Sequence, residues 1–325
     1  MLNGSIEVSF EGIEEAFQRI NGIANKTPVM TSRTLNMLFK SDIYFKCENF
    51  QRVGAFKFRG AFNTLSLLSE KQKERGVITH SSGNHAQAIA LAASLLGIKA
   101  TIVMPRGAPG NKINATKGYG VHVVFCDNTL KSRNKTTQEI IKKERSILIH
   151  PYDNDNIING QGTVAYELIK EVGSLDIVIA PLGGGGLLCG TALAAKGLCS
   201  NISVIGVEPS LADDALRSLK AGYIIPSDYP NTIADGLRTS LCERTFDIIR
   251  TYVDDVVTVS EIEIINAMKF LWERMKIIVE PSGAVSLAAI LSKKVIAENK
   301  KIGIIISGGN IDLKPFFQLL EKDIL

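Results

Sequence analysis

The sequence has few of the features that mark secreted, membrane or metal-stapled proteins. Its five cysteines are scattered along 325 residues without a C-x-x-C pair, which argues against a disulfide framework or a structural zinc site. The N-terminus is acidic and lacks the apolar core of a signal peptide, and no apolar stretch approaches the length of a membrane span. These absences predict a cytoplasmic protein without a membrane partner.

Neither sign of charge is in large excess. The 37 basic and 33 acidic residues leave a net charge of +4, too weak a bias to indicate binding to nucleic acid. The composition is 45% hydrophobic and 22% charged, which is ordinary for a globular protein. The length is sufficient for a large core divided between two lobes.

Short apolar runs rich in β-branched residues alternate with helical patterns through most of the chain. Near-continuous apolar strands separated by helical segments indicate open parallel sheets covered on both faces, an α/β fold. A helix is expected after the N-cap Ser260, because Ile264 and Met268 fall on one face, and another from Asn84. The predicted strands are Gly76–His80, Ala100–Pro105, Val121–Cys126, Ile177–Pro181, Ser203–Pro209 and Lys301–Gly308.

The strand–helix units between residues 76 and 148 predict a smaller lobe inserted into a larger one. The large domain then comprises residues 1–75 and 149–325, and the small domain residues 76–148. In open α/β sheets, ligands bind where strands end and helices begin. Four such junctions in this sequence carry small and polar residues, and they are the candidate parts of a site.

The first junction is the segment PLGGGGLLCG, residues 181–190, which follows a predicted strand and opens a helix. Consecutive glycines let backbone N–H groups face an anion, and a helix N-terminus adds positive potential. The segment lacks the Lys-Ser/Thr of a Walker loop, and no register satisfies G-x-G-x-x-G. It therefore favours a small phosphate ester over a nucleotide; the alternative is a tight structural turn.

The second junction contains Lys57, which lies between Phe56 and Phe58 in the segment GAFKFRG. A lysine is ordinarily a solvated surface residue. Aromatic neighbours would partly desolvate the ammonium and favour the neutral amine, the form that attacks an aldehyde. One aromatic ring could also cover a flat heterocycle. The segment therefore predicts a nucleophilic lysine.

The third and fourth junctions carry hydrogen-bonding side chains. The segment SSGNH, residues 81–85, gathers hydroxyl, amide and imidazole groups at the start of a helix. A helix cap needs only one of these side chains, so the cluster is interpreted as a site for a carboxylate and a ring hydroxyl. Ser307, in the segment SGGN at the end of the last strand, could bond a ring nitrogen; a plain turn is the alternative.

Together these segments resemble the fold-type II pyridoxal-phosphate enzymes, in the serine/threonine dehydratase and serine racemase branch. The resemblance runs over nearly the whole chain, and the matching segments stand in the family's order. It implies two open parallel-sheet lobes of the tryptophan synthase β-subunit type, the smaller inserted in the larger. The matching segments are ENFQRVGAFKFRGA, HSSGNHAQA, GQGTVAYE, PLGGGGLL, GVEPSLADDA, TIADGL, ERMKIIVEPSGA and ISGGNID.

The resemblance implies that the cofactor is pyridoxal 5′-phosphate (PLP), held as a Schiff base on Lys57. Phe56 would then lie against the cofactor ring, and Asn84 would bond the ring hydroxyl. Ser307 would meet the pyridine nitrogen, and a hydroxyl there does not enforce ring protonation, which favours elimination over transamination. The phosphate would be held by the amides of Gly183, Gly184, Gly185, Gly186 and Leu187.

The implied substrate is a small hydroxy-amino acid, from which the freed Lys57 would remove the α-proton as general base. Ser82 matches the family's second acid/base on the opposite face of the cofactor. Arg133 and Thr239 correspond to further pocket positions, although Arg133 also fits an ordinary charged helix residue. The substrate carboxylate would be received by Ser81, Ser82, Asn84 and His85.

The leading interpretation is an ammonia-lyase that converts L-serine and L-threonine to a 2-oxo acid and ammonia by α,β-elimination. The alternatives are a serine racemase with side dehydratase activity and a threo-3-hydroxyaspartate ammonia-lyase, in which Arg133 would bind the second carboxylate. Tyr152 stands where mammalian-type racemases carry Asn, which favours the dehydratases. From other classes, a catalytically silent binding protein and a Rossmann-type dehydrogenase are weaker alternatives.

A cation, a nucleotide and a second subunit are also implied by the resemblance. Glu208 and Asp214, with the carbonyl of Ala212, match a divalent-cation site, and such hard oxygen ligands suit Mg²⁺ or Ca²⁺. Without the resemblance this segment is an ordinary acidic loop. A homodimer is expected, and ATP is retained as an alternative allosteric effector. The positions matching an ATP site are Ser32, Arg52, Gln87, Tyr119 and Lys276, whereas Arg33 and Val53 differ from the family there.

Overall fold

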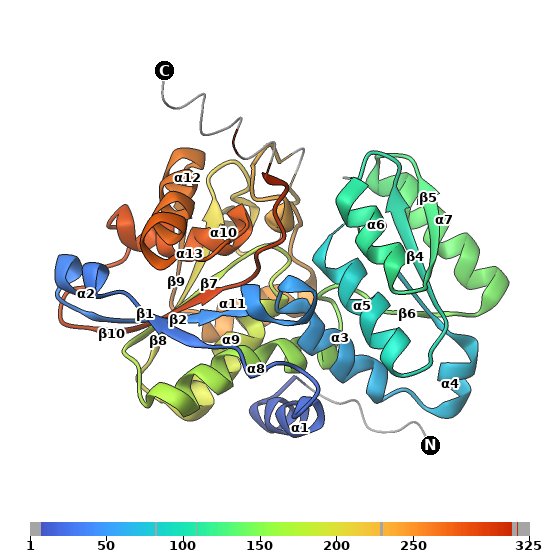
Figure 1. The fold of residues 1–325 in the computed structure, drawn as a ribbon, viewed down its shortest axis with the longest axis horizontal. Coiled ribbons are helices and arrows are strands. Elements are labelled where there is room, and N and C mark those ends of the chain that lie inside the picture. The colour runs from blue at the N-terminus through green and yellow to red at the C-terminus, as the bar shows by residue number, and fades with distance from the viewer. Residues whose placement is uncertain (1–7, 82, 109, 228–229, 314–316, 318–325) are drawn as a thin grey trace.

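The computed structural model describes residues 8–81, 83–108, 110–227, 230–313 and 317, which fold into two α/β lobes lying side by side (Figure 1). Each lobe has its own sheet, and among these residues no strand is shared. The large sheet has the order β1 (Val29–Thr31), β2 (Asp42–Cys47), β10 (Lys301–Ile306), β7 (Ile177–Pro181), β8 (Ser203–Pro209) and β9 (Asp255–Val259). The small sheet has the order β5 (His122–Cys126), β4 (Ala100–Pro105), β3 (Val77–His80) and β6 (Ile147–Leu148).

Parallel pairing dominates both sheets. β1 runs antiparallel to β2, and the other strand pairs are parallel. The predicted α/β fold with two parallel-sheet lobes is therefore confirmed, and the predicted strands are all present as β3, β4, β5, β7, β8 and β10. The domain boundaries after residues 75 and 148 stay a prediction.

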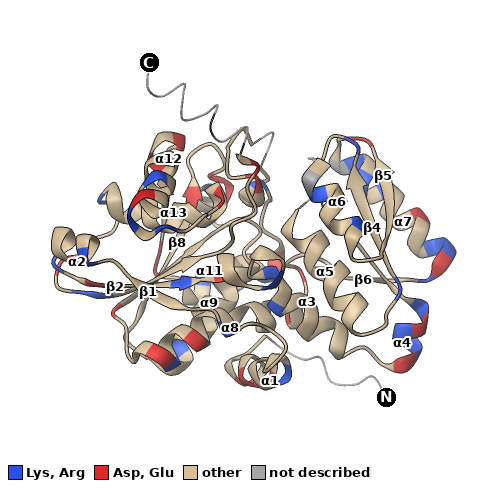
Figure 2. Cartoon of the chain, in the orientation of Figure 1, with Lys and Arg blue, Asp and Glu red and all other residues tan. Residues whose placement is uncertain are grey.

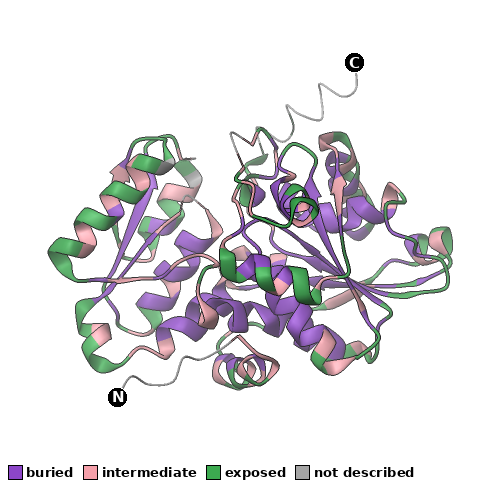
Figure 3. Cartoon of the chain, turned by 180° about the vertical axis from the view of Figure 1, so that it is seen from behind, coloured by how far each residue is buried: buried purple, intermediate pink, exposed green. Residues whose placement is uncertain are grey.

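Helices cover both faces of each sheet, and the strands between them are largely buried (Figure 3). Short helical segments are η1 (Glu48–Phe50), η2 (Arg52–Gly54), η3 (Asp235–Leu237) and the π-helical η4 (Leu271–Met275). The α-helices are α1 (Phe10–Ile20), α2 (Arg33–Phe39), α3 (Lys57–Ser66), α4 (Glu70–Arg75), α5 (Asn84–Leu95), α6 (Gly110–Gly118), α7 (Leu130–Glu144), α8 (Asp155–Val172), α9 (Gly186–Leu198), α10 (Asp214–Ala221), α11 (Glu243–Tyr252), α12 (Glu261–Phe270) and α13 (Pro281–Leu291).

The two helices predicted from local signals are both present. α12 begins after Ser260, whose hydroxyl accepts a hydrogen bond from the Glu263 N–H at 3.3 Å while the Glu263 carboxylate accepts one from the Ser260 N–H at 2.6 Å. This reciprocal cap satisfies two N–H groups that the helix itself leaves unbonded. Ile264 and Met268 are buried, as their spacing predicts, and α5 begins at Asn84.

Three helices beside the large sheet, α3, α8 and α9, cross at backbone contact. A Cβ on Gly160 of α8 would lie 2.5 Å from the Cα of Gly60 on α3. A Cβ on Gly190 of α9 would lie 2.5 Å from the nitrogen of Gly162 on α8. Only glycine, which has no Cβ, allows backbones to approach this closely. These crossings fix the N-terminal ends of α3 and α9 relative to one another.

Charged residues of both signs are distributed over the outer helices of both lobes, for example on α4, α7 and α8 (Figure 2). Within the described ranges, no helix is both long enough and apolar enough to span a bilayer. The expectations about nucleic-acid and membrane partners stay predictions.

Candidate active site

The candidate junctions converge between the two lobes, at the carboxyl ends of the strands. The segment before Lys57 is held at the end of β10, because the Phe56 N–H donates to the Ser307 carbonyl at 3.0 Å. Asn84, the first residue of α5 in the small lobe, accepts a hydrogen bond at 2.9 Å from the Asn310 side chain in the large lobe. Residues from distant parts of the sequence therefore share one site.

Lys57 is the first residue of α3 and carries the amine on which the predicted chemistry depends. Its Nζ donates to the Pro151 carbonyl at 3.0 Å and lies 5.0 Å from the centre of the Phe56 ring. The side chain is half-buried, and its partial loss of hydration lowers the pKa of the amine from 10.5 to about 8. At pH 7 about one amine in ten is then neutral and nucleophilic.

The glycine loop, residues 183–187, joins β7 to α9 and is closely surrounded. A Cβ on Gly184 would collide with the ring of Tyr152. Gly185 has a φ of 91°, and a Cβ there would lie 2.7 Å from the Cβ of Thr245. Glycine is therefore required at both positions, and the loop leaves its backbone N–H groups at the start of a helix, where an anion is stabilised. This geometry fits a phosphate group.

Aromatic rings line the site beside the glycine loop. The centroid of the His150 ring lies 4.7 Å from that of Tyr152 and 5.8 Å from that of His80. The Nδ1 of His150 accepts a hydrogen bond from the Asp153 N–H at 2.9 Å. Burial lowers the pKa of both imidazoles, that of His80 to about 4, and raises the pKa of Tyr152 to about 12. This wall is therefore uncharged at neutral pH.

Glu280, which no sequence signal identified as functional, lies in the same site. Its Oε1 accepts a hydrogen bond from the Nδ2 of Asn84 at 2.7 Å. The carboxyl group is buried, and burial, with a smaller contribution from Asp235, raises its pKa from 4.5 to about 8. The segment EPSGA gives no sign of this role, because a Glu before the Pro at the start of α13 is also an ordinary helix-boundary residue.

The residues predicted to receive the substrate carboxylate lie around the start of α5, except that Ser82 falls outside the described residues. The Oγ of Ser81 accepts a hydrogen bond from the Gly83 N–H at 3.2 Å. The Nε2 of His85 lies 3.3 Å from the Ile149 carbonyl, which only accepts, so Nε2 carries the proton. Burial lowers the pKa of His85 well below its ordinary value, so the ring is neutral and its Nδ1 is an acceptor. A substrate carboxylate would therefore bind the helix-start N–H groups rather than this ring.

Thr239 and Arg133 flank the site from opposite lobes. If Gly183 carried a Cβ, that atom would lie 3.3 Å from the Oγ1 of Thr239. Thr239 therefore lies beside the glycine loop. The guanidinium of Arg133, on α7, contributes to lowering the pKa of His80. Its Nε is buried and has no hydrogen-bond partner among the residues that the structure describes. Buried donors of this kind are normally satisfied, so Arg133 is suited to bind an anion.

Lys112 is a second residue that the sequence did not identify. Its Nζ forms an ion pair with Asp235. If Gly83 carried a Cβ, that atom would lie 3.8 Å from the same Nζ, so Lys112 lies beside the start of α5. Lys112 belongs to α6 in the small lobe and Asp235 to η3 in the large lobe. The ion pair therefore links the two lobes beside the segment expected to bind the substrate carboxylate.

The candidate cation ligands lie at the start of α10. Glu208, at the end of β8, accepts hydrogen bonds from the Ala215 and Leu216 N–H groups at 3.1 and 2.9 Å. Both oxygens of Asp214 are buried and accept no hydrogen bond of ordinary geometry from the described residues. Burial raises the pKa of Glu208 to about 8 and that of Asp214 to about 6. A divalent cation would supply the missing partner, so these oxygens fit one.

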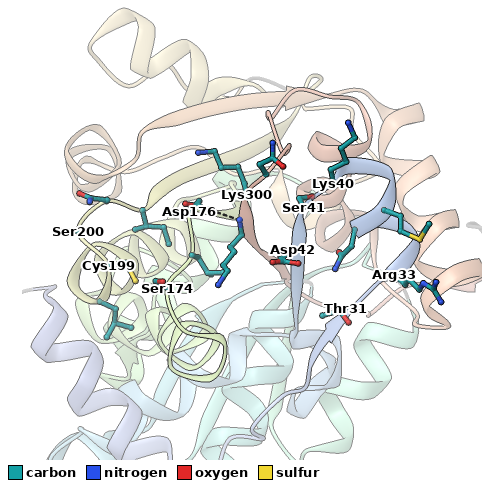
Figure 4. Close-up of a pocket in the computed structure, with 18 residues that line it drawn as sticks. Thr31, Arg33, Lys40, Ser41, Asp42, Ser174, Asp176, Cys199, Ser200 and Lys300 are labelled. Carbon is teal, nitrogen blue, oxygen red and sulfur yellow. Dashed lines mark hydrogen bonds between the residues drawn. The ribbon is translucent and has the colours of Figure 1, made fainter.

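A separate hollow of about 1230 Å³ lies at the opposite edge of the large sheet (Figure 4). It is formed at the amino ends of β2, β7 and β10, and its lining includes Lys40, Asp42 and Asp176. Asp176 accepts a hydrogen bond from the Lys301 N–H at 2.7 Å, which satisfies the first residue of β10. This edge carries none of the candidate catalytic groups, and we assign it no function.

The comparison with family models decides the identity of this site. The model described as pyridoxal-phosphate dependent enzyme matches residues 20–308. The chain belongs to this family. Among its relatives, a serine racemase from Schizosaccharomyces pombe is 50% identical over 97% of this chain and 98% of its own length. The L-threo-3-hydroxyaspartate ammonia-lyase of Saccharomyces cerevisiae is also 50% identical, over 96% of each chain.

The structural comparison agrees with the sequence comparison. The structure of maize serine racemase superposes with a TM-score of 0.93 at 44% identity, and the match covers 98% of each chain. The predicted fold type and the resemblance are therefore confirmed, and the chain is a PLP-dependent enzyme of the lyase and racemase group.

The residues of this PLP-dependent enzyme fit the cofactor. The buried amine of Lys57 is suited to bond its aldehyde, and Phe56 lies beside that amine. The glycine loop suits the phosphate, because a Cβ would fill the space beside Gly184 and Gly185. Ser307 is buried at the end of β10, with its Oγ 3.5 Å from the Ser282 carbonyl.

Replacing Gly184 by alanine is expected to weaken PLP binding by roughly 10- to 100-fold, because the added methyl group displaces the Tyr152 ring or the glycine loop. Titration of the apoenzyme with PLP, followed by visible absorbance, measures this. The matched control is Gly118→Ala, at an exposed position of α6 with nothing within 4 Å, which should bind PLP normally. Equal affinity of Gly184→Ala and the unmodified enzyme would contradict the assignment of the loop.

Proposed function

We propose that the enzyme is an ammonia-lyase that converts L-serine and L-threonine to a 2-oxo acid and ammonia. The observation that carries this proposal is the buried amine of Lys57, with a pKa of about 8, in a site that also holds the glycine loop and the hydroxyl of Ser307. The names of the two relatives refer to serine and 3-hydroxyaspartate, which are both β-hydroxy amino acids.

PLP supplies an electron sink that stabilises negative charge at the substrate α-carbon. The protein's own groups position the reaction and move the proton. The N–H groups at the start of α5 bind the substrate carboxylate, where the helix dipole favours negative charge. Ser307 would offer the ring nitrogen a neutral hydroxyl, which does not enforce protonation of that nitrogen as a carboxylate would. This restrains transamination and favours loss of the β-hydroxyl.

Lys57, whose amine would hold the cofactor, would also act as the base that removes the substrate α-proton. A pKa of about 8 suits this role, because a base is most effective when its pKa lies near the working pH. The uncharged wall of His80, His150 and Tyr152 excludes bulk water from the reacting atoms and keeps competing charges away.

The proposal is tested by incubating the PLP-loaded enzyme with L-serine and with L-threonine. Release of pyruvate and 2-oxobutyrate with one equivalent of ammonia is expected. Chiral chromatography of the remaining serine tests the alternative, a serine racemase with side dehydratase activity. Accumulation of D-serine with little pyruvate would reverse the order of the two functions.

Dehydration of threo-3-hydroxyaspartate is a second candidate, favoured by the buried Nε of Arg133 that has no partner among the described residues. A second carboxylate on the substrate would satisfy this donor. The expected result is that Arg133→Ala lowers kcat/KM for 3-hydroxyaspartate by roughly 10²-fold and for L-serine much less. Lys131→Ala, at an exposed position of the same helix, is the control. An equal loss for both substrates would contradict recognition of the second carboxylate by Arg133.

We also propose that Glu208, Asp214 and the Ala212 carbonyl bind Mg²⁺ or Ca²⁺. The support is the pair of buried Asp214 oxygens, which accept no hydrogen bond of ordinary geometry from the described residues. Removal of divalent cations with a chelator should lower the melting temperature, and added Mg²⁺ or Ca²⁺ should restore it. Asp214→Asn should abolish both shifts, whereas Asp247→Asn, at an exposed position of α11, should leave them unchanged. Shifts that persist in Asp214→Asn would place the cation elsewhere.

We propose a homodimer on the basis of exposed apolar side chains on one surface. Ile23, Phe50 and Ile278 are exposed. Asn25 donates to the Phe50 carbonyl at 3.1 Å, and Asn49 donates to the Ile278 carbonyl at 3.2 Å, so these segments are adjacent. A patch of this kind suits burial against a second copy. Sedimentation of the unmodified enzyme and of Phe50→Asp tests this, and an unchanged monomer in both would contradict it.

A cytoplasmic location and control by ATP complete the proposal. All five cysteines are free thiols, as expected in a reducing compartment.

Of the candidate ATP positions, Arg52 already donates to the Ile23 carbonyl at 2.5 Å and Ser32 caps α2. An ATP-dependent shift in kcat/KM for serine, measured at fixed Mg²⁺, would support nucleotide control.

A further inference from the structure

The side-chain amides of the site form a hydrogen-bonded chain whose direction is set at one end by a backbone carbonyl. The Nδ2 of Asn310 donates to the Val53 carbonyl at 2.6 Å. A carbonyl oxygen only accepts, so the nitrogen of the Asn310 amide must face it, and the reversed amide would place two oxygens in contact. The orientation of Asn310 is therefore determined by its surroundings.

The second step of this chain fixes Asn84. The same Nδ2 of Asn310 donates to the Oδ1 of Asn84 at 2.9 Å. The Nδ2 of Asn84 then lies toward Glu280, to whose Oε1 it donates at 2.7 Å. An amide nitrogen carries two hydrogens, so one N–H of Asn84 remains. Because the Oδ1 of Asn84 faces Asn310 and its Nδ2 faces Glu280, the hydrogen-bonding group that remains on this nitrogen is a donor.

We propose that Glu280, together with Asn310, is a positioning residue that turns the amide of Asn84 so that its remaining N–H faces the ring oxygen of PLP. The inference rests on membership of the PLP family and not on the proposed substrate. It goes beyond assigning Asn84 to the ring hydroxyl, because it names the groups that determine which end of the amide the cofactor meets.

The packing around Glu280 supports a fixed orientation. Glu280 is 3% exposed, so solvent does not compete for the hydrogen bond from Asn84. A Cβ on Gly308 would collide with the Oε1 of Glu280, and one on Gly54 would lie 2.6 Å from the Oδ1 of Asn310. Glycines therefore give both side chains the space they occupy. Asn84 belongs to the small lobe and its two partners to the large lobe, so the orientation depends on both.

The charge state of Glu280 adds a second consequence. The groups that affect its carboxyl are Asp235, which raises the pKa, and Lys112 with the side chain of Asn84 and the backbone of Asn310, which lower it. Burial outweighs these effects and holds the pKa at about 8, so the carboxyl is neutral at pH 7. A neutral acid accepts from Asn84 without repelling negative charge on the ring oxygen. Above pH 8 the carboxylate would disfavour that charge.

The proposal is tested with Glu280→Gln and Glu280→Ala, using the affinity of the apoenzyme for PLP and the visible spectrum of the bound cofactor. Glutamine retains an acceptor for Asn84 and resembles the neutral acid, so Glu280→Gln should bind PLP within about threefold of the unmodified enzyme. Alanine removes the acceptor and frees the amide to turn, so Glu280→Ala should bind PLP about 10- to 100-fold more weakly. The Glu280→Gln spectrum should also lose the change between about pH 7 and 9 that an ionising Glu280 produces.

Two controls separate positioning from loss of structure. Glu298→Ala removes an exposed glutamate of the same lobe and should leave PLP affinity unchanged. Asn310→Ala, which removes the other partner of Asn84, should weaken PLP as Glu280→Ala does. Should Glu280→Ala not fold, unchanged PLP affinity in Asn310→Ala, or weakening by Glu280→Gln equal to that by Asn310→Ala, would overturn the proposal. Equal weakening by Glu280→Gln and Glu280→Ala, or unchanged affinity in both Glu280→Ala and Asn310→Ala, would overturn the proposal. None of these measurements involves an amino-acid substrate, so failure of the proposed ammonia-lyase activity would leave them unaffected.

Discussion

Lys57→Ala is expected to leave a folded enzyme that binds PLP without a covalent bond and forms product at least ~10³-fold more slowly. The substitution removes both the amine that bonds the cofactor aldehyde and the base that removes the α-proton, and a positioned acid or base alone contributes about 10²- to 10⁴-fold. Borohydride treatment followed by mass spectrometry checks the bond, and a 2-oxo acid assay checks the rate. Lys26→Ala, at an exposed ion pair with Glu171, is the matched control.

Two results would contradict this assignment of Lys57. Borohydride-stable labelling of Lys57→Ala on another lysine would show that a residue other than Lys57 bonds the cofactor aldehyde. Product formation at an undiminished rate would show that the base lies elsewhere. Because the Nζ of Lys57 donates to the Pro151 carbonyl and no ion pair depends on it in the described chain, its removal should change the melting temperature little.

Arg59→Met is expected to lower the free energy of unfolding by about 3–5 kcal/mol, because it leaves the buried carboxylate of Glu48 without a cation and leaves Glu167 with Lys46 alone. Arg59 lies two residues after Lys57 and is fully buried. Its guanidinium donates to Glu48 at 2.8 and 2.9 Å and to Glu167 at 2.7 and 2.8 Å. Thermal and urea unfolding of the apoenzyme measure the loss. Even Arg59→Lys should be strongly destabilised, since an ammonium does not reproduce this planar pattern of donors.

The control for this prediction is Arg250→Met, which removes a surface ion pair with Asp247 at 3.6 Å. Such pairs contribute less than about 1 kcal/mol, so its unfolding transition should move little. If Arg59→Met unfolded like Arg250→Met, the buried network would have no part in the stability of α3.

The sequence predicted six strands but not β1, β2, β6 or β9, and for β2 the reason is physical. β2 carries Lys46 at its buried end, and a lysine normally marks a solvated position. In the folded chain its Nζ lies 2.8 Å from the carboxylate of Glu167 on α8 and donates to the Thr27 carbonyl at 2.8 Å. Neither partner lies close to Lys46 in sequence, so local patterns give no indication that this charge is buried.

The site was predicted where its chemistry is concentrated in one short segment, as it is around Lys57 and in the glycine loop. Glu280 and Lys112 were missed because their roles depend on the other lobe. Glu280 receives its hydrogen bond from Asn84, and Lys112 pairs with Asp235. The roles predicted for the substrate and cation residues stay predictions, and that of Ser82 concerns a residue outside the described part of the chain.

The glycine crossings of α3, α8 and α9 have a consequence for how this enzyme can vary. Lys57 begins α3, the glycine loop leads into α9, and α8 touches both helices through bare backbone at Gly60, Gly160 and Gly190. The distance between the Lys57 amine and the phosphate site is therefore set by helices in direct backbone contact. Replacing side chains elsewhere in the core does not change that distance. The walls of the pocket can be remodelled for new substrates while the span between the two cofactor anchors stays constant.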